Sequence, residues 1–158
     1  MIIEICATSI ESILNAQNAG AHRLELCENY NVGGVTPSEQ FLHEAIKVSS
    51  LPINVLIRPK GGDFIFNDQE YELMIHKINL FKQLNVKGFV VGFMEKDKSL
   101  NPDILKEFRE ITKGYELTFH RAFDFLSNQE ESLELLIEKD FDRILCSGHK
   151  LSAEKGIE

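Results

Sequence analysis

The stretch RLELC at residues 23–27 alternates polar and apolar side chains, and this alternation decides the fold class. Successive side chains of a strand point to opposite faces, so Arg23, Glu25 and Cys27 share one face while Leu24 and Leu26 share the other. An open parallel sheet has helices on both faces, and its strands should be apolar throughout. One polar face instead favours a closed barrel, whose interior tolerates charge near its mouth.

The same kind of run recurs along the chain, separated by helical stretches. We expect six strands, at residues 2–6, 23–27, 53–58, 88–92, 115–120 and 142–146. In the first, Glu4 and Cys6 share a face, and in the fifth Glu116 shares a face with His120. The pattern predicts an α/β fold of the TIM-type (β/α) barrel class, in which ligands bind at the carboxyl ends of the strands.

Five to six helices are expected between the strands, because start and stop signals flank the helical stretches. Thr8 with Glu11 has capping-box spacing, and the segment 36–39 (TPSE) repeats it with Pro37 at the first helical position. Three further starts are Asn67 with Glu70, Asn101 before Pro102, and Asn128 with Glu131. Gly20 and Gly114 are expected to end helices in a left-handed conformation. Residues 151–158 read as the beginning of a sixth helix.

Length and composition bound the architecture and the partners. The 158 residues predict one domain, 1–158, and because a complete barrel takes about 250 residues this one is expected to be incomplete. The net charge of −8 argues against nonspecific binding to nucleic acid or to an anionic membrane, and no apolar run approaches the roughly 20 residues that span a bilayer. An N-terminus that reads as a strand and an odd number of distant cysteines predict a cytoplasmic protein without a secretory signal.

Cys6 and Cys27 are the candidate metal ligands. They end consecutive strands, which lie about 5 Å apart in a barrel. Two thiolates that converge at this distance can hold a soft ion such as Cu(I). The alternative is that each cysteine is a small buried apolar residue, since no C-x-x-C spacing is present. Cys146 is a third candidate whose direction the sequence leaves open.

Charged residues of the first two strands form a second group. A buried charge is tolerated when it is paired, and Arg23 between Glu4 and Glu25 would satisfy that requirement inside the barrel. Structural pairing is the simpler role for Arg23, which is also a candidate ligand contact. Glu25 or Glu4 could instead act as a general base if burial raises its pKa.

The loop RPKGGDF at residues 58–64 predicts an anion site. Adjacent glycines let backbone amides approach a phosphate or carboxylate, and the loop also carries two cations. The loop at 33–38 brings a helix N-terminus to the same rim. Alternatively, the glycines only make tight turns. The candidate ligand-binding residues of the first loop are Arg58, Lys60, Gly61, Gly62 and Asp63.

The segment after the fifth strand, HRAFD at 120–124, supplies the remaining candidates. A histidine at a strand end can act as an acid or base or ligate a metal, so His120 is the candidate catalytic acid. Arg121 and Asp124 could orient it or bind an anion.

Together these motifs resemble the CutC family, named for copper homeostasis. The resemblance rests on residues 4–6 (EIC), 21–27 (AHRLELC), 33–38 (GGVTPS), 58–64 (RPKGGDF), 118–124 (TFHRAFD) and 147–148 (SG). It implies a TIM-type barrel, a cytoplasmic location, a role in copper tolerance or Cu(I) binding, and a homodimer. Cys146 lies outside the motifs and is not counted as a ligand.

Three functions follow as hypotheses. The first is a cytoplasmic copper-homeostasis protein that binds Cu(I) through Cys6 and Cys27. The second is a barrel enzyme acting on a small anionic or phosphorylated metabolite, with Glu25 as base and His120 as acid. The third is a truncated chain without function, because six strands leave two unpaired edges. Either the chain is a fragment or a truncated gene product, or it closes by a non-standard route such as pairing with another copy.

Overall fold

The computed structural model describes residues 1–150 and 152–157, and it contains one sheet of six parallel strands in the order β1-β2-β3-β4-β5-β6. The strands are β1 (Glu4–Ala7), β2 (Arg23–Leu26), β3 (Ile53–Leu56), β4 (Gly88–Val91), β5 (Glu116–Phe119) and β6 (Arg143–Ile144). Each matches a predicted run to within two residues at either end. Since sheet order equals chain order, every connection passes to the adjacent strand.

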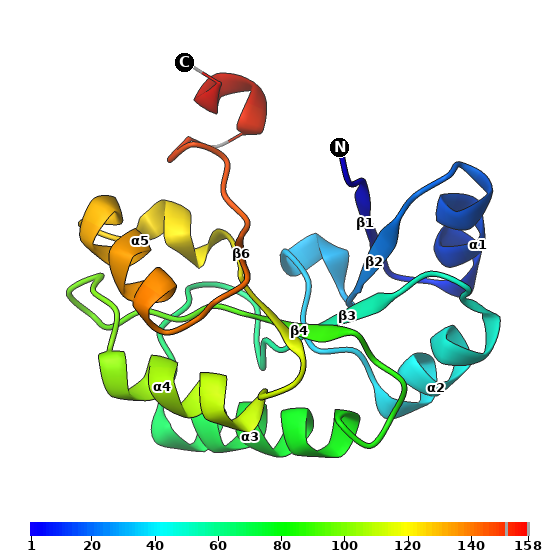
Figure 1. Cartoon of the computed structure of the whole chain (residues 1–158), viewed down its shortest axis with the longest axis horizontal. Helices are drawn as coiled ribbons and strands as arrows, with labels where there is room; N and C mark the ends of the chain where they lie inside the picture. Colours follow the sequence, from blue (N-terminus) through cyan, green and yellow to red (C-terminus); the bar gives the residue numbers. More distant parts are fainter. Residues whose placement is uncertain (151, 158) are drawn as a thin grey trace.

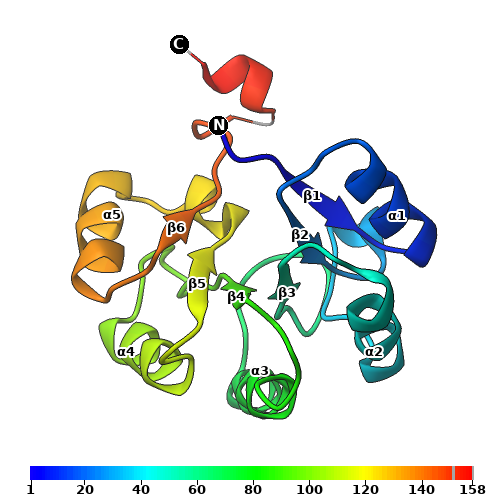
Figure 2. The same ribbon diagram turned by 45° about the vertical axis from the view of Figure 1, so that its right-hand side comes forward.

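Five α-helices cover the outer face of the curved sheet (Figures 1 and 2). They are α1 (Ile10–Asn18), α2 (Glu39–Val48), α3 (Asp68–Phe81), α4 (Pro102–Ile111) and α5 (Gln129–Glu138). The predicted incomplete TIM-type barrel is therefore confirmed. Of the expected sixth helix, the described part is a 3₁₀ turn, η3 (Ala153–Gly156), while residues 151 and 158 lie outside the described residues. No described helix is long and apolar enough to cross a membrane.

Two of the five predicted helix starts were placed wrongly. Ser9, not Thr8, caps α1 and forms a capping box with Ser12. Ser38, not Thr36, caps α2 by accepting from the amide of Phe41, so the helix begins after Pro37. Thr36 is engaged elsewhere, because its hydroxyl accepts from the amide of Arg58 at 2.8 Å and ties this loop to the end of β3.

The other three starts are confirmed by side-chain caps. Asn67, Asn101 and Asn128 each accept a backbone N–H of the first helical turn of α3, α4 and α5. Gly20 and Gly114 have φ values of 82° and 91°, as the predicted left-handed stops require.

The hydrophobic core lies between the strands and the helices. On β2, Leu24 and Leu26 are fully buried while Arg23 and Glu25 face the barrel interior with partial exposure, as the alternation predicts. The central strands β3 and β4 are buried on both faces. The sheet therefore shows its polar inner side mainly on the strands toward its two edges.

The sheet is open between β1 and β6. In the described ranges 1–150 and 152–157, no strand pairs with the outer edge of either one, and the gap is visible in Figure 2. Apolar side chains lie at this opening, with Ile5 exposed by 37% and Leu145 by 41%. The predicted unpaired edges are thus present in the structure.

Candidate functional site

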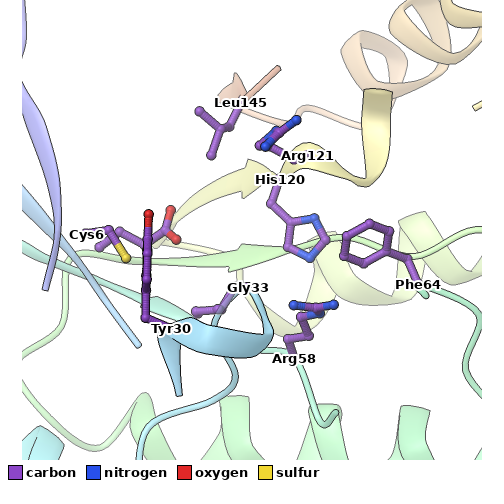
Figure 3. Close-up of a pocket in the computed structure, with 10 residues that line it drawn as sticks. Cys6, Tyr30, Gly33, Arg58, Phe64, His120, Arg121 and Leu145 are labelled. Carbon is purple, nitrogen blue, oxygen red and sulfur yellow. The ribbon is translucent and has the colours of Figure 1, made fainter. Parts of the chain in front are cut away.

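A cavity of about 390 Å³ lies at the carboxyl ends of the strands, where the fold class predicts a site (Figure 3). Five of its lining residues were singled out from the sequence: Cys6, Glu25, Arg58, His120 and Arg121. Four others were missed as site residues: Tyr30, Leu56, Phe64 and Leu145. Tyr30 and Phe64 both sit in the glycine-containing loops after strands, and this position was the signal that could have identified them.

The thiols of Cys6 and Cys27 meet, as the strand ends predicted. Their Sγ atoms lie 3.0 Å apart and share a hydrogen bond. That bond and then burial raise the pKa of Cys6, whereas the same bond lowers the pKa of Cys27. The shared hydrogen bond therefore makes Cys27 the more acidic thiol of the pair and Cys6 the less acidic one.

The surroundings of the pair leave one open side. Cys27 is buried, whereas Cys6 is exposed and lines the cavity. Gly34, in the left-handed region at φ 83°, packs so closely that an added Cβ would lie 3.3 Å from the Cys27 sulfur. Access to the two sulfur atoms is therefore from the cavity.

The donor set for a metal consists of these two sulfurs. Within the described part of the chain, no group of three or more His, Cys, Asp or Glu side chains is placed to hold a metal ion. Cys146 is exposed beyond the end of β6 and is not part of the cavity wall. A soft, low-coordinate ion fits two thiolates better than a hard cation does.

Arg23 and Glu4 form an ion pair one layer deeper in the barrel. Glu4 accepts from Arg23 Nε and, at 3.0 Å, from the amide of Asn54. Among the described contacts Arg23 pairs with Glu4 and does not bridge to Glu25. This ion pair satisfies the charges below the cavity, and Arg23 is not in the cavity wall.

Glu25 is the acidic group of the cavity. The parallel register sets it beside Cys6 on the neighbouring strand. Burial, together with the negative charge of Glu4, raises the pKa of Glu25 from 4.5 to about 7. A carboxyl with this pKa can accept or release a proton near neutral pH, which is what a general base requires.

Arg58 joins the two loops that carry the rim. Its guanidinium donates to the carbonyls of Val32 (3.0 Å), Gly34 (2.9 Å) and Gly62 (2.7 Å), and it stacks on the ring of Phe64 at 4.7 Å. The side chain is buried, and its Nε has no partner among the described residues. Arg58 is therefore a structural clamp that also places a permanent positive charge at the cavity.

His120 is a buried neutral imidazole. Its Nδ1 accepts from the amide of Ala122 at 3.1 Å, which places the ring proton on Nε2, and Nε2 has no partner among the described residues. Burial and the charge of Arg58 lower its pKa to about 3. The ring lies 4.9 Å from that of Phe64, in space that exists because residue 92 is glycine.

Arg121 and Asp124 connect this strand end to the loop after β6. Asp124 accepts from Arg121 Nε at 3.0 Å and from the amides of Ser147 (2.9 Å) and His149 (3.0 Å). Burial opposes its ionisation, but these hydrogen bonds keep the pKa of Asp124 below its usual range. Asp124 thus holds Arg121 in place, and Arg121 lines the cavity.

The rest of the predicted anion loop lies outside the cavity wall. Lys60 forms an ion pair with Glu70 at 2.9 Å, and Asp63 accepts from the amide of Ile65. Gly61 packs against Val32, and the carbonyl of Gly62 is used by Arg58. Of the loop residues predicted to bind a ligand, the structure brings Arg58 alone into the cavity wall.

Known proteins match nearly the whole length of the chain. The model of the CutC family matches residues 1–158. A CutC family protein of Pasteurella multocida is 44% identical over 156 residues, and a human protein named copper homeostasis protein cutC homolog is 37% identical over 156 residues. The crystal structure of a CutC protein from Streptococcus agalactiae matches with a TM-score of 0.87 at 32% identity, covering 96% of this chain and 75% of that one. The chain spans 64% and 57% of the lengths of the first two relatives.

Proposed function

This chain belongs to the CutC family, and we propose that it takes part in copper homeostasis by binding Cu(I) between Cys6 and Cys27. The observation that carries the proposal is the 3.0 Å separation of the two sulfur atoms, reached from the cavity. Thiolates are the ligands that Cu(I) prefers, and the ion replaces the proton that the pair shares. Copper uptake is therefore accompanied by proton release.

A Cu(I) titration of the reduced chain without oxygen, against a chromophoric Cu(I) chelator, tests the proposal. We expect one ion per chain, loss of binding in the Cys6→Ser, Cys27→Ser double variant, and retention in Cys146→Ser. The last variant removes an exposed thiol outside the cavity and serves as the matched control. A double variant that binds as tightly as the unmodified chain would refute the assignment.

The location and assembly belong to the same proposal. A reducing compartment such as the cytoplasm keeps the thiol pair available for the metal. A homodimer is the assembly that the family resemblance implies, and light scattering of the full chain distinguishes it from a monomer.

A second function, binding and conversion of a small anionic metabolite, is supported by the other residues of the cavity. Glu25, with a pKa of about 7, shares the wall with the cationic Arg58 and Arg121. Such an arrangement suits a substrate that is anionic at one end and loses a proton at the other. A thermal-shift screen of carboxylates and phosphates tests it: stabilisation that is lost in Arg121→Ala but kept in Lys106→Ala supports the site, and the absence of any stabilising compound contradicts it.

A further inference from the structure

The cavity has two chemically different ends, and only one of them is needed to hold a copper ion. Cys6 lies on one side, while Arg58, His120 and Arg121 lie across the cavity from it (Figure 3). A copper site made of two thiolates requires no cations on the opposite side of the cavity. The end of the cavity formed by Arg58, His120 and Arg121, the cationic end, is therefore suited to a second ligand besides copper.

The geometry of the sulfur pair favours a third ligand on copper. With the sulfurs 3.0 Å apart, the two sulfur atoms must move apart for an ion to enter between them. Two-coordinate Cu(I) places its ligands at about 180°, whereas a three-coordinate ion needs only about 120° between them. The three-coordinate ion therefore requires the smaller separation of the two sulfur atoms. Because Cys27 is buried and Cys6 borders the cavity, the third position opens into the cavity.

The charges at the opposite end specify what else the ligand carries. Arg58 is a buried cation, and its Nε lacks an acceptor, as does Nε2 of the neutral His120, among the described residues. Unpaired buried donors make this end strongly attractive to negative charge. Arg121 is partly exposed there and can contact a carboxylate directly.

The size and lining of the cavity restrict the ligand to a small molecule. Its volume of about 390 Å³ lies within the range of small-molecule sites, about 300–1,000 Å³. Phe64, Leu56 and Leu145 provide apolar surface between the two ends. A short aliphatic stem can lie against these residues.

We propose that copper is bound in this cavity together with a small anionic thiol of the glutathione class. The thiol sulfur is the third copper ligand, and a carboxylate of the same molecule lies at Arg121 in the field of Arg58. This inference rests on the proposed Cu(I) site and adds to it the form in which the metal is held.

The exchange balances without any change of oxidation state. Copper arrives as a complex of Cu(I) with two thiolates of the carrier, of net charge −1. Cys27 bonds to copper as a thiolate and releases its proton to water, one carrier thiolate leaves, and that thiolate takes the proton of Cys6. The Cys6 thiolate then bonds to copper in turn. The products are Cu(I) with three thiolates, of charge −2, one neutral carrier thiol and one released proton, so the total charge of −1 is conserved.

The test uses the reduced full chain loaded anaerobically with Cu(I) in the presence of either glutathione or 2-mercaptoethanol, a thiol without a carboxylate. Native mass spectrometry after gel filtration measures the copper and the thiol retained per chain. We expect one glutathione per copper and no retained 2-mercaptoethanol. In Arg121→Ala we expect the dissociation constant of glutathione from the copper-loaded chain to rise about tenfold, because a charge-assisted contact is lost. Lys106→Ala removes a lysine that is 65% exposed on α4 and is expected to change nothing.

The outcomes separate this inference from the proposed function. Copper retained without glutathione overturns the inference and leaves Cu(I) binding intact. Equal retention of both thiols by the unmodified chain overturns the role of the cationic end, and this comparison holds even if the Arg121 variant does not fold. No copper on the unmodified chain overturns the proposed function and this inference with it.

Discussion

Replacement of Glu25 by glutamine is expected to stabilise the fold at alkaline pH and to leave it nearly unchanged near pH 5. The folded-state pKa of Glu25 is raised from 4.5 to about 7, with burial as the main cause. Between these two values the folded chain binds more protons than the unfolded chain, so the contribution of this group to stability falls as the pH rises through the window. At about 1.36 kcal/mol per pKa unit, ionisation of the buried Glu25 lowers the free energy of unfolding by about 3 kcal/mol above pH 7. Because Glu25 borders the open cavity, we expect a gain of about 1–3 kcal/mol for Glu25→Gln.

Urea unfolding of both proteins at pH 5 and pH 8.5, in the presence of a reductant, measures this difference. Groups other than residue 25 titrate in both proteins and cancel when the two are compared. Glu107→Gln is the matched control, because Glu107 is exposed on α4, and it should show no pH-dependent difference. If Glu25→Gln gains no stability at pH 8.5 relative to pH 5, the carboxylate is not desolvated and the reasoning fails.

Three further predictions concern the residues around the cavity and one helix start. The pKa of His120 is lowered to about 3, so the contribution of this group to stability is present above pH 6.5 and is lost as the pH falls toward 3. The NMR chemical shifts of the ring should therefore stay constant from pH 5 to 8. A titration midpoint near 6.5 would show that the ring is not buried. Gly92→Ala would place a Cβ 2.1 Å from the His120 ring, so it should displace the ring and lower the free energy of unfolding in urea by about 1–3 kcal/mol or more. The control Gly114→Ala, in open space at φ 91°, should lower it by about 1 kcal/mol and leave the ring in place. An undisturbed ring in Gly92→Ala would refute the packing argument. Asn67→Ala removes the α3 cap and should cost about 1 kcal/mol, and an unchanged urea midpoint would show that the capping box with Glu70 does not contribute.

The meeting of Cys6 with Cys27 was predictable because it depends on topology alone. In a barrel, where strands pair in chain order, two residues that end consecutive strands lie close together whatever the conformation of the loop between them. The pairing of Glu4 with Arg23 follows from the same register and from the need to neutralise charge inside a barrel. The alternation of polar and apolar residues is local in the sequence, and the barrel class that it indicates supplies the strand order.

The role of Arg58 was not predictable from the sequence. Its partners are backbone carbonyls of residues 32, 34 and 62, and their directions depend on the conformation of two loops. The sequence shows an arginine beside two glycines, which is equally typical of an anion site and of a loop clamp. The prediction of the α1 cap was wrong because the sequence offers two pairs with capping-box spacing. These are Thr8 with Glu11 and Ser9 with Ser12, and the structure uses the second pair.

The open order of the sheet has a consequence for hydrogen exchange. Each strand pairs only with the strands next to it in the sheet, so β1 and β6 each lose one strand pairing when they detach, while β3 and β4 must each break two. Amides of the central strands should therefore exchange last, and those of β1 and β6 should exchange by local fraying. A copper ion shared by Cys6 and Cys27 would join β1 to β2. It would slow the hydrogen exchange of the β1 amides and leave the exchange of the β6 amides unchanged.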